Sequence, residues 1–186
     1  MPEFTLAVVC TEDGFIAREP GHTPGDWASF EEQQLFHSRV SAADWSIMGR
    51  GTHEAVDRPE RRRIIFSSSG EGTWRRPNQI WVNPEGLTPS DLPQLVNGHH
   101  PLRFGLILGG TAVHDWFLHH NAISKIFLTI EPVRFGEGLP VFTGQSRYGP
   151  EEEILKRGFV RVSDRTLNEA GTRLMTFRLV PKRTSA

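Results

Sequence analysis

Three glycine-containing clusters follow apolar runs that have the length of buried strands. They are Gly49-Arg50-Gly51-Thr52, Ser67-Ser68-Ser69-Gly70 and Gly109-Gly110-Thr111. Each brings backbone N–H groups and small hydroxyls to the end of a strand, and a helix is expected after the first and the third. Helix starts favour phosphate, and glycine lets a phosphate approach the backbone because no Cβ intervenes. A tight turn explains any one cluster, whereas all three together indicate a nucleotide site.

Charge gives little indication of a macromolecular partner. Lys and Arg number 21 and Asp and Glu 22, so the formal net charge is −1. A chain with so small a net charge has no general attraction for nucleic acid or an anionic membrane, and we expect neither partner. Arginine makes up most of the basic residues, and Arg50 can add a two-pronged contact to a phosphate.

The apolar runs and turn residues alternate along the chain. Short buried strands are predicted at 4–10, 45–48, 64–67, 79–82, 104–108 and 123–130. Helices are predicted at 30–40, where Ser29 and Glu32 form a capping box, at 91–96, where Ser90 is the expected cap, and at 111–119. The tripeptide Arg61-Arg62-Arg63 is expected to lie in a solvated loop before a strand.

The last third of the chain has a different pattern. Two long strands are predicted at 154–162 and 173–180, with a turn near 168–171. Strand–helix alternation followed by a hairpin predicts an α/β fold of three layers. Its sheet would be mixed and mostly parallel, with a C-terminal antiparallel hairpin at one edge. Ligands of such sheets bind at the carboxyl ends of the strands, where the glycine clusters lie.

Length and composition exclude several classes of protein. The 186 residues predict a single domain over 1–186, with 37% hydrophobic residues. Cys10 is the only cysteine, which excludes an internal disulfide and a cysteine-rich zinc site. The pairs His99-His100 and His119-His120 have diverging side chains, so no metal site is expected. Without a signal-peptide pattern or an apolar run of ~20 residues, a cytoplasmic location is expected.

Several motifs, taken in order, resemble those of the dihydrofolate reductase superfamily. They are Asp13-Gly14-Phe15-Ile16-Ala17, Trp27, Ile47-Met48-Gly49-Arg50-Gly51-Thr52, Leu108-Gly109-Gly110-Thr111-Ala112-Val113 and Leu128-Thr129. The run Phe135-Gly136-Glu137-Gly138-Leu139-Pro140-Val141-Phe142 resembles more narrowly the reductase domain of bacterial riboflavin-biosynthesis deaminase-reductases and its stand-alone relatives. The resemblance extends over about residues 4–180.

The resemblance implies a three-layer domain that binds NADPH. Arg50 and Thr52 would contact the adenosine phosphates, and Ser67 and Ser68 would line the pocket of the 2′-phosphate. The loop made of Gly109, Gly110, Thr111 and Ala112 would hold the pyrophosphate. Ile16 and Ala17 would lie near the nicotinamide, whose hydride passes to a pyrimidine- or pterin-like ring.

The resemblance also implies a proton-handling carboxylate. In dihydrofolate reductases it lies on the first helix, five residues after a tryptophan, and Trp27 plus five gives Glu32. A carboxyl group in a half-apolar pocket can hold the amidine-like edge of a substrate ring and supply a proton. The alternative is that Glu32 only caps its own helix, and Glu31 is a weaker candidate.

On the substrate side, Trp27 and Arg39 are the predicted binding residues. His37 and Arg39 match a histidine and an arginine of the riboflavin reductases, where the arginine belongs to the region that grips a ribose-phosphate. Those enzymes carry an Asp-Asp-Pro stretch after the first glycine loop, whereas residues 54–60 here read Glu-Ala-Val-Asp-Arg-Pro-Glu. The cysteine motif of their deaminase half is absent from this sequence.

These observations predict an NADPH-dependent reductase of a heterocycle, with 5-amino-6-(5-phosphoribosylamino)uracil as the first substrate to test. A dihydrofolate reductase and a non-catalytic NADP-binding module of the same fold are the alternatives. By resemblance, a homodimer is expected.

Overall fold

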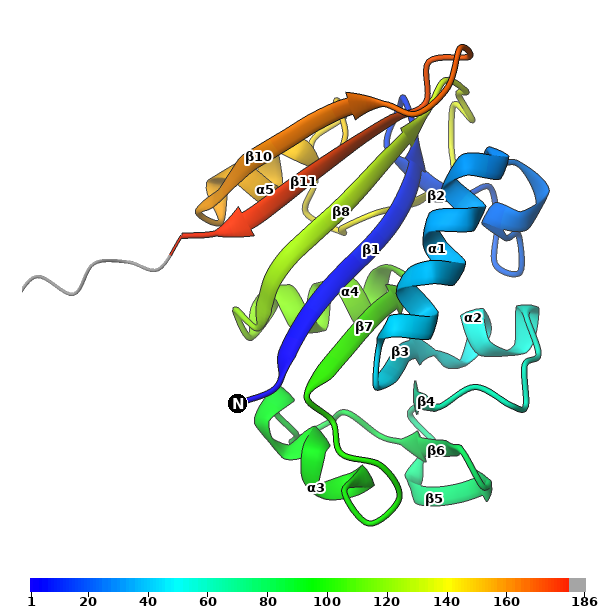
Figure 1. Ribbon diagram of the computed structural model, residues 1–186, viewed down its shortest axis with the longest axis vertical. Coiled ribbons are helices and arrows are strands. Elements are labelled where there is room, and N and C mark those ends of the chain that lie inside the picture. Colours follow the sequence, from blue (N-terminus) through cyan, green and yellow to red (C-terminus); the bar gives the residue numbers. More distant parts are fainter. Residues whose placement is uncertain (181–186) are drawn as a thin grey trace, which may run out of the picture.

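A nine-stranded sheet forms the centre of the computed structural model, which describes residues 1–180 (Figure 1). The last six residues of the domain expected over 1–186 lie outside the described part. In spatial order the strands are β10 (Phe159–Thr166), β11 (Arg173–Leu179), β8 (Ile123–Glu131), β1 (Glu3–Thr11), β7 (Phe104–Gly109), β3 (Trp45–Gly49), β4 (Arg63–Phe66), β6 (Gln79–Val82) and β5 (Glu71–Arg76).

The sheet is mixed and mostly parallel. The strands from β8 through β1, β7, β3 and β4 to β6 are parallel neighbours. Antiparallel strands close both edges: β5 pairs with β6, and the hairpin β10–β11 pairs with β8. This arrangement confirms the predicted sheet and its C-terminal hairpin. A second, small sheet joins β2 (Phe15–Ala17) to β9 (Leu139–Pro140).

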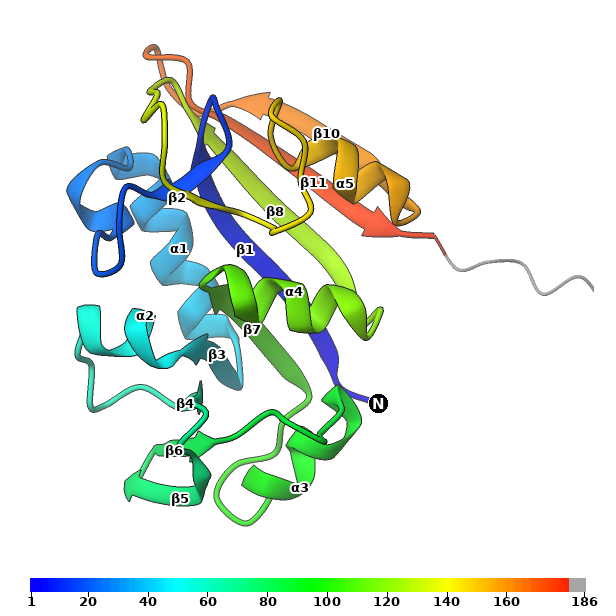
Figure 2. The same ribbon diagram turned by 180° about the vertical axis from the view of Figure 1, so that it is seen from behind.

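Helices cover both faces of the sheet. Figure 1 shows α1 (Phe30–Ala42) and α2 (Arg50–Ala55) on the near face of the sheet. Figure 2, the view from the opposite side, shows α4 (Thr111–His119) and α5 (Glu151–Lys156) on the other face. The short α3 (Leu92–Val96) packs its buried residues into the same core as α4. Two 3₁₀ turns at Pro24–Asp26 and Pro89–Asp91 precede α1 and α3. The three predicted layers are therefore confirmed.

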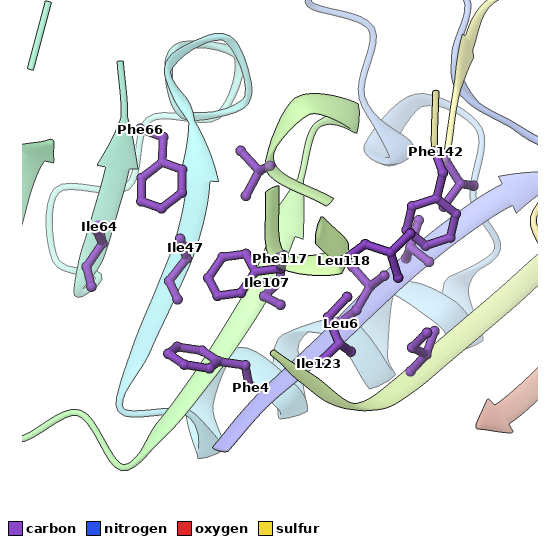
Figure 3. Close-up of a cluster of buried hydrophobic side chains, with 14 of the residues drawn as sticks. Phe4, Leu6, Ile47, Ile64, Phe66, Ile107, Phe117, Leu118, Ile123 and Phe142 are labelled. Carbon is purple, nitrogen blue, oxygen red and sulfur yellow. The ribbon is translucent and has the colours of Figure 1, made fainter. Parts of the chain in front are cut away.

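The two faces of the sheet are packed very differently. On the α4 side, Phe117 is fully buried between Phe4 and Phe66, as Figure 3 shows. Val113 lies one turn before it and is also buried, as the helical spacing predicts. On the other side, Glu32 is the one fully buried residue among residues 30–42 of α1. The apolar core thus lies on the α4 side, and α1 buries a carboxyl group.

Three local predictions were wrong. Residues 154–156 belong to α5 rather than to a strand, and β10 begins only at Phe159, after the turn at Gly158 (φ +89°). Thr88, not Ser90, caps the turn before α3, because its N–H and hydroxyl both bind the Asp91 carboxylate. Arg63 is buried in β4, where its guanidinium donates to Val56 O at 2.8 Å, instead of lying in solvent.

Two features bear on the class of protein. Within residues 1–180, no helix has the length and apolar character needed to cross a bilayer. The same part of the chain contains no group of three or more His, Cys, Asp or Glu side chains arranged to hold a metal ion.

Candidate active site

The loops after β7, β3 and β4 meet at one edge of the sheet, because these strands are parallel neighbours. A Cβ placed on Gly49 would lie 3.9 Å from Gly109 O and Gly110 N. A Cβ placed on Gly110 would lie 4.0 Å from both Thr52 Oγ1 and Ile16 Cδ1. The first and third glycine clusters therefore form one surface, and β2 lies against it.

This surface carries uncapped helix starts. Gly49 and Gly110 are the N-caps of α2 and α4, and neither helix has a side-chain cap. The first N–H groups of both helices are accordingly available to an anion. In α4 these include the N–H groups of Thr111 and Ala112. Arg50 is exposed and its Nε lies 3.8 Å from Glu54 Oε1, and a Cβ placed on Gly51 would have open space around it.

The serine cluster after β4 divides into an inward and an outward residue. Ser67 is 8% exposed, and its hydroxyl lies 3.1 Å from the Ser69 hydroxyl inside the turn. Ser68 is exposed. Of the two serines predicted to line a phosphate pocket, Ser68 is thus the exposed one and Ser67 the buried one.

Ile16 and Ala17 are positioned by β9. Phe15 pairs with Pro140 and Ala17 with Leu139, and the Thr111 hydroxyl donates to Pro140 O at 2.6 Å. The start of α4 is thereby tied to the strand that carries Ile16. The sequence places these residues far apart, and β9 joins them.

His114 lies between the residues that follow β9 and the glycine loop at Gly109. Burial lowers its pKa to about 4, so the ring is neutral and Nδ1–H donates to Val141 O at 2.8 Å. Its Nε2 faces Gly109, where a Cβ would lie 2.7 Å away and where φ is +103°. Both constraints require glycine at position 109.

Asp13 holds the loop that follows β8. Its carboxylate accepts hydrogen bonds from the Thr11 hydroxyl at 2.6 Å and from the N–H groups of Phe135 and Gly136 at 3.2 and 2.7 Å. Partial burial raises the pKa of Asp13, but these bonds outweigh it and leave the pKa below its usual value. The two motifs Asp13-Gly14 and Phe135-Gly136 therefore belong to one structural unit.

Glu32 points toward β8 and away from its own helix start. Its carboxyl group accepts the Thr129 hydroxyl at 2.5 Å, and its other oxygen lies 3.9 Å from Arg39 Nη1. Burial raises the pKa of Glu32 to about 7, and the charge of Glu131 adds to this, while Thr129 and Arg39 oppose it. A carboxyl group with such a pKa can both hold and release a proton near neutral pH.

The capping alternative for Glu32 is wrong, because Glu131 takes its place. Ser29 Oγ accepts the Glu32 N–H at 3.3 Å, but the Ser29 N–H donates to Glu131 Oε1 at 2.8 Å. The other oxygen of Glu131 accepts the Thr172 hydroxyl at 2.6 Å. Glu131 thus fixes the start of α1 to β8 and to the C-terminal hairpin.

Glu31, the weaker candidate, faces the hairpin turn. Its carboxylate accepts a hydrogen bond from Asn168 at 3.1 Å, which lowers its pKa. The structure therefore separates the two neighbouring glutamates, one buried against β8 and one at the hairpin.

Two buried donors without partners lie on or just before the helix that carries Glu32. Among residues 1–180, four buried side-chain nitrogens lack a hydrogen-bond partner, and Trp27 Nε1 and Arg39 Nη1 are two of them. Trp27 packs edge-on against Phe135, and the Arg39 guanidinium stacks over Phe127 at 4.1 Å. Unsatisfied buried donors are costly, and a ligand that accepts hydrogen bonds removes the cost. His37 instead is exposed and contacts Arg61.

Sequence reasoning missed Glu131, Thr172 and Phe127. The signal for β8 was its alternation: Lys125, Phe127, Thr129 and Glu131 alternate with Ile126, Leu128 and Ile130. That pattern indicates one apolar face and one face available for other roles. No signal in the sequence pairs Glu131 with Ser29 or Thr172.

Comparisons with solved structures find this architecture in proteins of low sequence identity. A deaminase/5-amino-6-(5-phosphoribosylamino)uracil reductase of Thermotoga maritima is 19% identical, with a TM-score of 0.70 over 96% of this chain. A riboflavin biosynthesis protein of Shewanella sp. PV-4 is 15% identical, with a TM-score of 0.66 over 96% of this chain and 99% of its own. A dihydrofolate reductase of Enterococcus faecalis, complexed with NADP(H), is 16% identical, with a TM-score of 0.65 over 95% of both chains.

The chain has the dihydrofolate reductase fold. The fold expected from the motifs is therefore confirmed. The chain spans 57% of the length of the Thermotoga maritima protein. No protein-family model matches the sequence, and a search of curated proteins gives no match either.

Glu32→Gln tests the raised pKa through protein stability. The pKa of Glu32 is 4.5 in the unfolded chain and about 7 in the folded protein. The protonated carboxyl group therefore contributes its full stabilisation of the folded state below pH 4.5, and this contribution is lost as the pH rises through about 7. The free energy of unfolding of the wild type should fall, relative to Glu32→Gln, by about 3 kcal/mol between about pH 4.5 and about pH 8. Urea denaturation at several pH values measures this, and parallel curves for the two proteins would contradict it.

Glu131→Gln tests the electrostatic part of the same account. Removing the negative charge of Glu131 should lower the pKa of Glu32, because that charge opposes ionisation of the neighbouring carboxyl group. Carbon-13 NMR of the glutamate side-chain carboxyl carbons measures the pKa directly, and the resonance is assigned by its loss in Glu32→Gln. Glu85→Gln, an exposed loop variant, is the matched control and should leave the pKa unchanged.

Proposed function

We propose that the protein is an NADPH-dependent reductase that transfers hydride to a pyrimidine- or pterin-like heterocycle. One observation carries the proposal: Gly49, Thr52, Gly110 and Ile16 meet at one edge of the sheet. The similarity to reductases of the same fold, one of them complexed with NADP(H), supports it.

The residues present fit a dinucleotide. Gly110 stands at an uncapped helix start, and the nearest atoms to a Cβ there are 4.0 Å away on Thr52 and Ile16. A side chain at Gly110 would occupy this space, which the absence of a Cβ leaves for a pyrophosphate. Free N–H groups and the positive end of α4 suit its charge.

The cofactor assignments follow the same geometry. Gly109, Gly110, Thr111 and Ala112 would hold the pyrophosphate, with Arg50 and Thr52 at the adenosine phosphates. Ser68 would contact the 2′-phosphate, and Ser67 would shape the turn that presents it. Ile16 and Ala17 would lie against the nicotinamide. NADPH supplies the hydride when bound, so the protein has to orient the reacting groups and provide a proton.

Glu32 is the proposed proton donor. It is 4% exposed, held by Thr129, and has a pKa of about 7. In this state it can bind the amidine-like edge of a heterocycle and transfer a proton to it. The unpartnered N–H groups of Trp27 and Arg39 would donate to the same substrate.

The first substrate to test is 5-amino-6-(5-phosphoribosylamino)uracil, which the Thermotoga maritima protein is described as reducing. The second is dihydrofolate, because this chain and the Enterococcus faecalis reductase cover 95% of each other. A homodimer and a cytoplasmic location belong to the same proposal.

Cofactor binding is tested by calorimetric titration with NADPH and NADH. Arg50→Ala should weaken NADPH binding about tenfold, since it removes a charge-assisted contact to phosphate. Ser68→Ala should weaken NADPH binding but leave NADH unchanged. Arg58→Ala removes another exposed charge elsewhere and is the matched control. Equal affinities of all four proteins for NADPH would contradict the assignment, and no binding at millimolar NADPH would overturn the proposed cofactor.

Turnover is followed as loss of absorbance at 340 nm with each substrate. Glu32→Gln should lower kcat at least a hundredfold without changing the NADPH affinity, because it removes the proton but not the cofactor site. NADPH binding without oxidation by either substrate would favour the non-catalytic module.

A further inference from the structure

No helix among the described residues covers the α1 side of the outer strands, although Leu174 on that side is buried. In Figure 1, no helix among residues 1–180 lies in front of β11 and β10, whereas α5 lies behind them. The strand β8, which carries Thr129 and Glu131, adjoins β11. The proposed proton donor, which contacts Thr129, therefore lies at the buried end of a face whose other end, at Arg178, is exposed.

The strand register places two cations opposite each other on this face. Lys125 of β8 is the direct partner of Arg178 of β11, and Arg178 is the direct partner of Val160 in β10. Directly opposite residues of an antiparallel pair project to the same side, and like charges in such a pair destabilise it. An anion between Lys125 and Arg178 would reverse that repulsion.

The next two rows add hydroxyls and two more arginines. Phe127, Thr176 and Ser163 form the middle row, and Thr129, Leu174 and Arg165 form the third. Arg39 reaches over the middle row from α1, with its guanidinium 4.1 Å from the centre of the Phe127 ring. Lys125 Nζ lies 5.5 Å from the same centre.

The four cations of this face are poorly balanced by carboxylates. Within residues 1–180, the one carboxylate within 4 Å of any of them is Glu32, 3.9 Å from Arg39. Burial lowers the pKa of Arg39, and the positive charge of Arg165 lowers it further, so the two arginines repel each other electrostatically. Arg39 Nη1 is buried and has no hydrogen-bond partner.

We propose that this face binds the anionic group of the substrate, a phosphate or a carboxylate, whose ring lies against Glu32. The inference rests on the proposed function for the ring, but the anion site itself rests on the register and charges of β8, β11 and β10. Three strands and three rows span about 10 Å by about 14 Å, which the side chains of Lys125, Arg165 and Arg178 can bridge. Arginine forks and hydroxyls match the oxygens of such groups.

The site is distinct from the dinucleotide loops. Those lie after β3, β4 and β7, whereas the cationic face is formed by β8, β11 and β10. Lys125, Arg165 and Arg178 belong to none of the motifs that carry the family resemblance. An anion bound there would therefore select substrates by their charged group, not by their ring.

The test is an NMR titration of the full-length, nitrogen-15-labelled protein with inorganic phosphate and, separately, with glutarate. At least one anion should shift amides of residues 125–127, 163–165 and 174–178. Arg165→Ala/Arg178→Ala should bind that anion at least tenfold more weakly. Arg58→Ala/Arg103→Ala removes two other exposed charges and should match the wild type. The anion that binds more tightly identifies the group.

Three outcomes would overturn the inference. Shifts confined to residues 49–52, 67–70 and 109–112 would place the anions at the dinucleotide loops alone. If the double variant and the wild type bind the anion with equal affinity, Arg165 and Arg178 do not belong to the site. A wild-type dimer that the double variant converts to a monomer, without anion-induced shifts, would assign the face to a second copy of the chain.

The same samples separate this inference from the proposed function. NADPH added to each sample reports on residues 49–52 and 109–112. Anion shifts on β8, β10 and β11 without any effect of NADPH would support the anion site and overturn the proposed cofactor. Shifts caused by NADPH without shifts caused by the anions would support the proposed cofactor and overturn the anion site.

Discussion

Burial of the Glu32 carboxyl group is the constraint on which the candidate active site depends. A carboxylate placed in a protein interior loses its hydration, and the loss is tolerated only where hydrogen bonds or protonation offset it. Here Thr129 provides the hydrogen bond, and Glu131 anchors the Ser29 end of the same helix turn to β8. The helix that carries Glu32 buries no apolar residue fully among residues 30–42. Its position is therefore set by polar contacts to β8, and the stable apolar core is left to α4.

Because the polar contacts of α1 lie on one face of the sheet and the apolar core on the other, the two faces have different roles. On the α4 side, Phe117, Phe4 and Phe66 pack closely and hold the strands in register. That packing fixes the ends of β3 and β7, so the glycine loops lie close enough together that a Cβ on Gly49 would be 3.9 Å from Gly109 O and Gly110 N. On the α1 side, the structure holds a buried carboxyl group, two buried donors without partners and, on the outer strands, exposed arginines. The stable face positions the site, and the open face provides its chemistry.

Most of the fold was predictable from the sequence, because apolar period and turn residues act locally. The helix at Thr111–His119 and the strands β1, β3, β4, β6, β7 and β8 agree with their predictions to within one or two residues. The errors arose where a longer-range partner decided the outcome. Residues 154–156 are apolar enough for a strand, but the acidic residues 151–153 favour the start of a helix and Gly158 follows its end. Arg63 reads as solvated, and only its placement beside Ile65 on a strand face buries it. The loops of the candidate site were found from glycine and resemblance together, whereas the partners of Glu131 were not, since they lie 102 and 41 residues away along the chain.

A crystal structure of the protein with bound NADPH is the most direct measurement of the central claim, that separate loops and the α1 face form one catalytic site. The pyrophosphate should lie on the N–H groups of residues 109–112, and the nicotinamide should lie between Ile16 and the side of the sheet that carries Glu32. A cofactor bound elsewhere, or a nicotinamide on the α4 side of the sheet, would contradict the account.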